Sequence, residues 1–214
     1  MIVTPVETLA KLAEGLRDDE IHVWHVRYDR QRGRDPLRRV LAAYLGRHAD
    51  DVVLTDGEHG RPALAPALDS SLGFNWSHSG QHALIAVGEH VMPGVDVERQ
   101  RERPRALEIA QRYFTREESD ALAALPAEQR HAAFLELWTA KEAVLKAIGR
   151  GIAFGLDRLN IVSESDGLAL DRLDDHDVKE WQLRRLRFEP DLLGALAWRG
   201  ERRDVRCGFL AIDE

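Results

Sequence analysis

The sequence has 214 residues, a length that allows one large domain or two small ones joined closely. Its 44% hydrophobic and 31% charged residues are near the averages of soluble globular proteins, which argues against a disordered, collagen-like or coiled-coil chain. The formal net charge of −7 argues against a nucleic-acid partner, because such binding depends on neutralising phosphates. No apolar run approaches the roughly 20 residues of a membrane span, and the N-terminal residues lack a signal-peptide pattern. The sequence therefore predicts a cytoplasmic protein with no membrane partner.

The first half of the chain predicts strands around one helix. Residues 20–28 alternate apolar and polar side chains, the period of a half-buried strand. Residues 36–46 predict a helix, with a proline in the first turn and a closing glycine. Further strands are expected at residues 52–55, 72–76 and 83–87, and a loop through Pro93 and Gly94 leads to another strand at 95–98.

The second half is helical from residue 104 to 148, and strands return from 159 to the last one at 205–212. Residues 83–88 and 195–200 form a weak internal echo, which favours an α+β fold of two similar halves. We expect the halves to be residues 1–93 and 94–214, with the ligand at their interface. The single Cys207 lies in an alternating strand pattern and is interpreted as a packing residue.

Two acidic residues share one face of the strand at 95–98. The side chains of Asp96 and Glu98 leave one face, and those of Val95 and Val97 leave the other. Carboxylates so placed repel each other, so the pair is stable on a wet strand face or with a cation between them. The spacing leaves both interpretations open.

The helix around Trp138 carries charged residues at its apolar side. At roughly 100° per residue, Lys141 falls within an apolar arc, Glu142 lies on the rim of that arc, and Lys146 follows one turn later. A buried ammonium is unfavourable unless it reaches solvent or meets an anion. One interpretation is an i,i+4 Glu–Lys pair beside a lysine that reaches solvent. The other is a metal-binding carboxylate with two ammonium groups for phosphate oxygens, all on one side of the helix.

Two further segments carry groups suited to an anion. The segment from Phe74 to Gly80 predicts a strand that ends in a turn with Ser77, His78 and Ser79. The hydroxyl and backbone N–H groups of such a turn suit an anion. Ordinary turn-forming serines are the alternative. A serine hydrolase is a third interpretation, but the glycine-flanked serine elbow is absent. Arg61, between Gly60 and Pro62, presents a cation in a tight turn.

The segment Thr115-Arg116-Glu117-Glu118 is typical of a helix start. Thr115 is the expected N-cap, and Glu118 its capping-box partner. This structural role accounts for Glu118 and leaves Glu117 available for chemistry.

In the order of these motifs, the sequence resembles the 4′-phosphopantetheinyl transferases of the surfactin-synthetase-activating type. The resemblance covers roughly residues 50–159 and depends most on the Asp-x-Glu and Trp-x-x-Lys-Glu motifs at 96–98 and 138–142. It implies that the phosphopantetheine arm of coenzyme A is transferred to a serine of an acyl or peptidyl carrier protein, with release of adenosine 3′,5′-bisphosphate. It also implies a monomer built as a pseudo-dimer of two similar α+β halves.

The resemblance assigns roles by position. Asp96, Glu98 and Glu142 would be ligands of Mg²⁺, which prefers hard oxygen ligands. Glu117, Glu142 and Lys146 would be the catalytic residues. The residues assigned to coenzyme A are Arg38, Arg61, Ser77, His78, Lys141 and Lys146.

The N-terminal part departs from this pattern. Relatives usually place a charged helical stretch between the first strand and the helix that begins here near Pro36, whereas this chain has only residues 29–35 there. Basic residues of that stretch hold the 3′-phosphate of coenzyme A. The available substitutes are Arg30, Arg32, Arg34 and Arg38.

The implied reaction is attack of a carrier serine hydroxyl on the β-phosphorus of coenzyme A. Mg²⁺ and Lys146 would stabilise the negative charge, and Glu117 or a metal-bound water would accept the proton. Two alternatives remain open: a magnesium-dependent diphosphate hydrolase, and a non-catalytic carrier-binding or nucleotide-binding module of the same fold.

Overall fold

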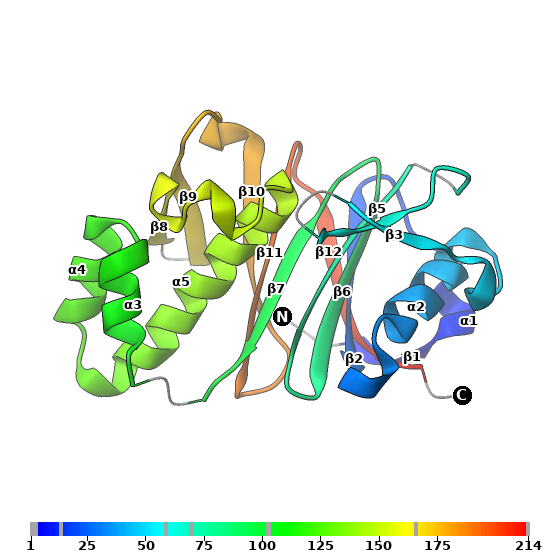
Figure 1. Cartoon of the computed structure of the whole chain (residues 1–214), viewed down its shortest axis with the longest axis horizontal. Helices are drawn as coiled ribbons and strands as arrows, with labels where there is room; N and C mark the ends of the chain where they lie inside the picture. Colours follow the sequence, from blue (N-terminus) through cyan, green and yellow to red (C-terminus); the bar gives the residue numbers. More distant parts are fainter. Residues whose placement is uncertain are drawn as a thin grey trace. The chain divides into compact units, whose positions relative to one another are not determined.

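The computed structural model describes residues 4–12, 15–57, 60–68, 71–101, 104–164 and 167–212. Contacts divide the chain into two compact units. Unit 1 contains the residues up to Pro93 together with those from Arg202 onward, and unit 2 runs from Gly94 to Glu201. Both units combine helices with β-sheets, which confirms the predicted α+β class (Figure 1).

Unit 1 is built on a five-stranded mixed sheet. Its strands, in spatial order, are β1 (Thr4–Thr8), β12 (Asp204–Ala211), β2 (Glu20–Arg27), β6 (His82–Glu89) and β5 (Leu72–Ser79). The pairs β1–β12 and β12–β2 are parallel, and the pairs β2–β6 and β5–β6 are antiparallel. The other elements are α1 (Leu9–Leu12), the 3₁₀ turns η1 (Arg30–Arg32) and η2 (Ala49–Asp51), helix α2 (Asp35–Leu45), and the short strands β3 (Leu54–Asp56) and β4 (Pro62–Leu64).

The last strand belongs to unit 1. β12 pairs with β2 from Asp204 to Leu210, so the final residues complete the first sheet. The expected second half, residues 94–214, is therefore corrected to Gly94–Glu201. Cys207 is buried in β12, in agreement with its interpretation as a packing residue.

Helix α2 forms where the sequence predicts it. Pro36 occupies the first turn, and Gly46 ends the helix in the left-handed conformation at φ 60°. Its apolar side chains, such as Leu37 and Leu41, are buried in one core with Trp24 and Ile85 of the sheet. Helix α2 thus covers one face of the unit 1 sheet.

Unit 2 has a three-stranded antiparallel sheet with strand order β10-β11-β7. The strands are β7 (Gly94–Arg99), β10 (Trp181–Arg187) and β11 (Leu192–Arg199), and a separate hairpin is formed by β8 (Leu159–Glu164) and β9 (Gly167–Leu173). The helices are α3 (Ala106–Tyr113), α4 (Arg116–Ala124) and α5 (Ala127–Ile148), with 3₁₀ turns η4 (Ile152–Phe154), η5 (Leu156–Arg158) and η6 (Val178–Glu180). The echoed segments lie in β6 and β11, and each of these strands is flanked by two antiparallel neighbours.

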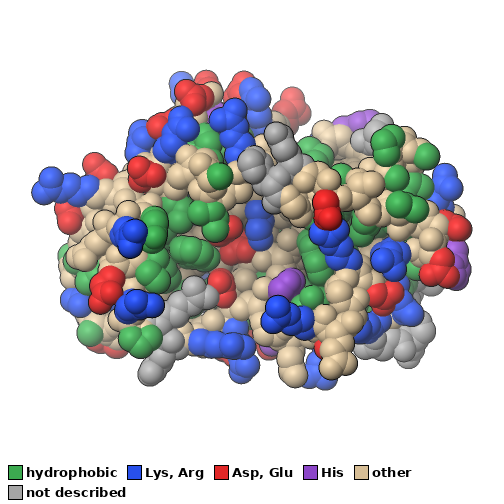
Figure 2. Space-filling view, viewed as in Figure 1, with side chains coloured by type: hydrophobic (Ala, Val, Ile, Leu, Met, Phe, Trp, Pro, Cys, Tyr) green, Lys and Arg blue, Asp and Glu red, His purple; other side chains and the backbone are tan. Residues whose placement is uncertain are grey.

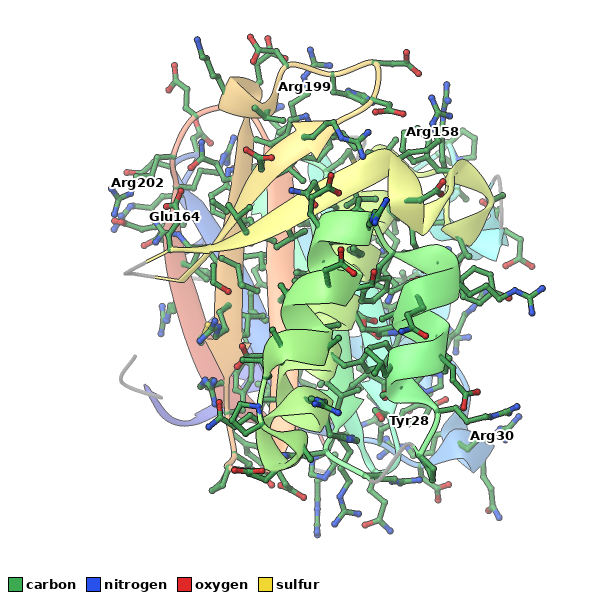
Figure 3. The ribbon with its side chains drawn as sticks, turned by 90° about the vertical axis from the view of Figure 1, so that its left-hand side faces the viewer. Tyr28, Arg30, Arg158, Glu164, Arg199 and Arg202 are labelled. Atoms are coloured by element: carbon green, nitrogen blue, oxygen red, sulfur yellow. The ribbon has the colours of Figure 1, made fainter. Side chains whose placement is uncertain are left out.

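Helix α5 is the central element of unit 2. One side packs on β7 and β11, and the other is covered by α3, α4 and β8 (Figures 1 and 3). The aromatic side of the helix lies on this covered side, where the rings of Phe134 and Phe114 stack at 5.5 Å. Because both sides are buried, residues of α5 reach two separate environments.

Candidate functional site

The acidic pair lies on β7 at one edge of the unit 2 sheet. Asp96 is opposite Ala195 and Glu98 is opposite Leu193 in the register with β11. The two side chains leave the same face of the strand, as the alternation requires. Asp96 is 6% exposed and Glu98 is half-buried, so this face is not a fully solvated one.

Glu142 reaches the same region from α5. Its side chain is 9% exposed, and among the described residues its buried Oε1 has no hydrogen-bond partner. The pKa of Glu142 is raised from 4.5 to about 7, mostly by burial and also by the nearby Asp96 and Glu98, while the Lys146 ammonium opposes the rise. Burial, the largest cause, disfavours the charged form of this carboxylate.

Lys146 completes the cluster. Its Nζ donates to Asp96 Oδ1 at 2.7 Å and to the carbonyl oxygen of Val95 at 3.1 Å. The structure therefore brings together four of the predicted residues, Asp96, Glu98, Glu142 and Lys146, within unit 2. We call these four residues the acidic cluster.

The acidic cluster fits a divalent cation. Carboxylate oxygens are the ligands that Mg²⁺ prefers, commonly in combination with substrate phosphates. A cation there would relieve the repulsion between the carboxylates and satisfy the partnerless Glu142 oxygen. The residues that can hold it are Asp96, Glu98 and Glu142.

Gly94 allows α5 to approach the acidic pair. A Cβ atom at this position would lie 2.0 Å from the carbonyl oxygen of Ala143 and 2.4 Å from the backbone nitrogen of Ala147. From the sequence, Gly94 is predicted only to lie in the loop before the strand. The signal was the glycine directly before the strand residues 95–98, since glycine within a strand often marks a close backbone approach.

Lys141 lies outside the acidic cluster. Its ammonium is 0% exposed, forms an ion pair with Glu118 at 2.7 Å, and donates to the carbonyl oxygens of Leu156 and Leu159. This corrects the prediction that Lys141 contacts coenzyme A. It also corrects the expectation that both lysines project from one side, because five residues of helix separate their directions by roughly 140°.

The start of α4 has the predicted capping box. Thr115 accepts from the backbone N–H of Glu118, and Glu118 Oε2 accepts from the backbone N–H of Thr115. Glu117 lies in the same first turn with an exposed side chain. Its expected role as a proton acceptor stays a prediction.

Ser77 and His78 lie within a strand of unit 1, not in a turn. β5 continues to Ser79, and the turn is formed by Gly80, at φ 62°, and Gln81. The expected anion site of turn N–H groups is therefore corrected, because these residues are paired in register with β6. Alternation directs Ser77 to a buried side and His78 to solvent.

Arg61 supports the backbone of unit 1. Its Nη2 donates to the carbonyl oxygens of Phe74 at 2.9 Å and Pro93 at 3.1 Å, and burial lowers the pKa of its guanidinium. Arg61 thus ties β5 to the residue that precedes unit 2. Its predicted contact with coenzyme A stays a prediction.

A pocket of about 240 Å³ lies at the end of β2 in unit 1. Its lining residues are Arg27, Tyr28, Asp29, Arg32 and Gln81. The exposed ring of His78 stacks on Tyr28 with 4.5 Å between centroids. The pocket is therefore lined by two arginines, one aspartate, one glutamine and an aromatic ring.

The four basic residues proposed to replace the missing stretch differ in their relation to this pocket. Arg32 lines it and forms an ion pair with Asp35 at 3.0 Å. Arg34 is not among the lining residues and forms an ion pair with Asp56 at 2.6 Å. Arg30 is exposed on η1, close to Tyr28 in Figure 3, and Arg38 is half-buried on α2. On the face drawn in Figure 2, basic and acidic side chains are interspersed over the surface.

The family model of the 4′-phosphopantetheinyl transferase superfamily matches residues 92–200. This range is about half of the chain and nearly coincides with unit 2, which holds the acidic cluster. The chain belongs to the 4′-phosphopantetheinyl transferase superfamily. The resemblance inferred from the motifs is thereby confirmed.

Individual relatives agree with this membership. The 4′-phosphopantetheinyl transferase HetI of Nostoc is 37% identical over 156 residues, or 70% of this chain and 66% of that protein. The 4′-phosphopantetheinyl transferase psf-1 of Bacillus pumilus is 34% identical over 153 residues, or 67% of this chain and 64% of that protein. A solved holo-[acyl-carrier-protein] synthase of Thermotoga maritima matches 51% of this chain and 63% of that chain, with a TM-score of 0.42 and 18% identity.

The chain therefore spans less than two thirds of the length of these curated relatives, 66% of HetI and 64% of psf-1. Within the described part of the chain, no helix combines the length and apolar character that a membrane crossing needs.

Proposed function

We propose that this protein transfers the 4′-phosphopantetheine group of coenzyme A to a serine of an acyl or peptidyl carrier protein, with Mg²⁺ as the metal. The observation that carries this proposal is the acidic cluster. Three carboxylates and one ammonium converge there from β7 and α5, inside the region that matches the superfamily. Membership of the superfamily supports the same reaction.

Asp96, Glu98 and Glu142 would hold the metal, and a bound Mg²⁺ supplies positive charge to the diphosphate oxygens. Lys146 contributes an ammonium that Asp96 already orients at 2.7 Å. A positive charge that is already held in place in a partly buried site stabilises developing negative charge more strongly than the same charge does in water. The protein's main contribution is therefore positioning and electrostatics, as phosphoryl transfer requires.

In the proposed step, the serine Oγ forms a bond to the β-phosphorus of coenzyme A. The bond from this phosphorus to the bridging oxygen breaks, and adenosine 3′,5′-bisphosphate leaves with the electron pair. Glu117 accepts the serine proton, because its carboxylate is exposed beside the capping box and is not needed for the cap.

Unit 1 by itself offers a candidate site for a phosphate group. The pocket beside Tyr28 offers Arg27 and Arg32, and His78 stacks on its wall. Guanidinium groups suit phosphate recognition because their N–H donors match its oxygens. Arg38, Arg61 and Ser77 remain predicted contacts of coenzyme A, and the monomeric state and cytoplasmic location remain predictions as well.

Intact mass spectrometry tests the proposal. The protein is incubated with coenzyme A, Mg²⁺ and an apo acyl or apo peptidyl carrier protein, and the carrier should gain the mass of one phosphopantetheine group. Glu142→Gln should abolish the gain. Glu128→Gln is the matched control, because Glu128 is an exposed residue on the same helix.

The same assay separates the alternatives. Cleavage of coenzyme A without a change in carrier mass would indicate a diphosphate hydrolase. Carrier binding without either product would indicate a non-catalytic module. Either result with both carrier types would contradict the proposed transfer.

A further inference from the structure

A buried polar network joins three elements of unit 2 through Lys141. Its Nζ lies 2.7 Å from Glu118 Oε2 on α4, 2.8 Å from the Leu156 carbonyl oxygen and 2.6 Å from the Leu159 carbonyl oxygen. An ammonium group has three N–H donors, so these three acceptors can use all of them. The side chain is 0% exposed. Lys141 is therefore built to hold protein groups together.

Glu118 is the second centre of this network. Its Oε2 accepts from the Thr115 backbone N–H at 3.0 Å, and its Oε1 accepts from the Ile161 backbone N–H at 2.8 Å. Thr115 Oγ in turn donates to Asn160 Oδ1 at 2.7 Å. One carboxylate thus fastens the first turn of α4 to the start of β8, and its counter-charge comes from α5.

This network ends next to the proposed proton acceptor and to one proposed metal ligand. Glu117 directly precedes Glu118 in the first turn of α4, and Glu142 directly follows Lys141 on α5. The Lys141–Glu118 pair at 2.7 Å is thus a direct link between the two helices that carry them. Figure 3 shows α4 and α3 lying over α5 on this side of unit 2.

We propose that Lys141 is a positioning residue: it fixes the first turn of α4 on α5 and thereby sets the place of Glu117 relative to Glu142. This inference rests on the proposed function, in which Glu117 accepts the proton of the carrier serine. Lys141 itself touches neither coenzyme A nor the carrier. Its loss displaces the proton acceptor and leaves the binding of coenzyme A and Mg²⁺ intact.

Hydrogen exchange tests the structural part of the proposal and does not depend on an activity assay. In Lys141→Met the backbone amides of Thr115 and Ile161 should exchange faster, because the Glu118 carboxylate that accepts from both loses its counter-charge. Lys179→Met, at an exposed position on η6, is the control and should leave both amides unchanged. Unchanged exchange in Lys141→Met would overturn the proposal.

Kinetics test the positioning part. We expect Lys141→Met to lower kcat on the order of 10- to 100-fold, because small displacements of a reacting group have effects of this size. The KM for coenzyme A and its calorimetric affinity with Mg²⁺ should stay at the wild-type values. Lys146→Met is the contrasting variant and should weaken the binding of coenzyme A.

Two results would overturn the positioning role. A loss of coenzyme A affinity in Lys141→Met similar to that in Lys146→Met would make Lys141 a ligand-binding residue. Faster amide exchange with unchanged kcat would make its role structural only.

If Lys141→Met does not fold, a second variant can be used for the same measurements. In the double variant Lys141→Met, Glu118→Gln, the glutamine retains a carbonyl acceptor and leaves no unpaired buried charge. Amide exchange, kcat and the affinity for coenzyme A in this double variant then test the positioning role of Lys141. If the wild-type protein modifies no carrier, the proposed function fails, and amide exchange still decides whether Lys141 holds α4.

Discussion

The backbone of α5 lies against Gly94 of β7 with no room for a side chain between them. A Cβ at Gly94 would lie 2.0 Å from the carbonyl oxygen of Ala143, the residue that follows Glu142. The absence of one methyl group thus sets how closely the Glu142 carboxylate approaches Asp96. The glycine is part of the site although it offers no functional group.

Gly94→Ala should therefore weaken both the fold and the metal site. The methyl group must push two backbone segments apart, and such overpacking typically lowers the free energy of unfolding by about 1–3 kcal/mol. The displaced helix should also reduce the stabilisation of the protein by Mg²⁺, measured as a shift in Tm. Gly15→Ala is the control, because no atom lies within 4 Å of a Cβ there. A Gly94→Ala protein with wild-type Tm and the wild-type Mg²⁺ shift would contradict this role.

Glu142 should make the metal-free protein less stable as the pH rises. Its pKa is raised from 4.5 to about 7 in the folded protein, so the folded state holds a proton that the unfolded state releases. The resulting stability is fully present below pH 4.5 and is lost as the pH rises through 7. The loss amounts to roughly 3 kcal/mol, since one pKa unit corresponds to about 1.4 kcal/mol. Urea unfolding in EDTA should show it.

Glu142→Gln provides the comparison, because an amide does not titrate in this range. In EDTA the variant should be more stable than the wild type at pH 8 and close to it at pH 4.5. Addition of Mg²⁺ should stabilise the wild type more than the variant. Parallel stability curves of the two proteins between pH 4.5 and 8 would show that Glu142 is not held in the environment described.

Cys207 should be unreactive in the native protein. Burial raises the pKa of its thiol from 9.0 to about 12, and only the thiolate is nucleophilic. The thiolate population at pH 8 is then on the order of 10³-fold below that of the unfolded chain. Alkylation followed by mass spectrometry should therefore label the protein in urea and not in buffer. Equal labelling rates in both conditions would place Cys207 outside the core.

Arg32→Ala should reduce the preference for coenzyme A over 3′-dephospho-coenzyme A. Arg32 lines the pocket beside Tyr28, and a charge-assisted contact to phosphate changes affinity by about 10-fold or more. Calorimetry with the two ligands and Mg²⁺ measures the difference. Arg34→Ala is the matched control, because Arg34 is also ion-paired with an aspartate but does not line the pocket. An equal loss for both ligands, or the same loss in Arg34→Ala, would place the 3′-phosphate elsewhere.

Local sequence patterns were sufficient for many elements of this fold. The proline and glycine that bound α2, the capping box of Thr115 and Glu118, and the alternation of β7 each act within a few residues. The acidic pair on one strand face follows from that alternation alone. Helical spacing likewise placed Lys141 among apolar side chains, and its burial confirms that position.

Only the tertiary structure decided what these residues contact. Lys141 meets Glu118, Leu156 and Leu159, which come from segments outside its own helix, so the helical period could show that it needs an anion but not which one. The serines after Trp76 read as a turn, and pairing with β6 makes them part of a strand.

The pairing of the last strand, β12, was likewise decided by the tertiary structure. Its alternating pattern predicts a strand but not a partner, and β12 pairs with β2 near the opposite end of the chain. Backbone propensities act over a few residues, whereas strand partners and buried ion pairs are selected by packing of the whole unit. For this reason the sequence determined the elements and the chemistry of the carboxylates, and the packing of α5 on Gly94 and Glu118 determined where that chemistry lies.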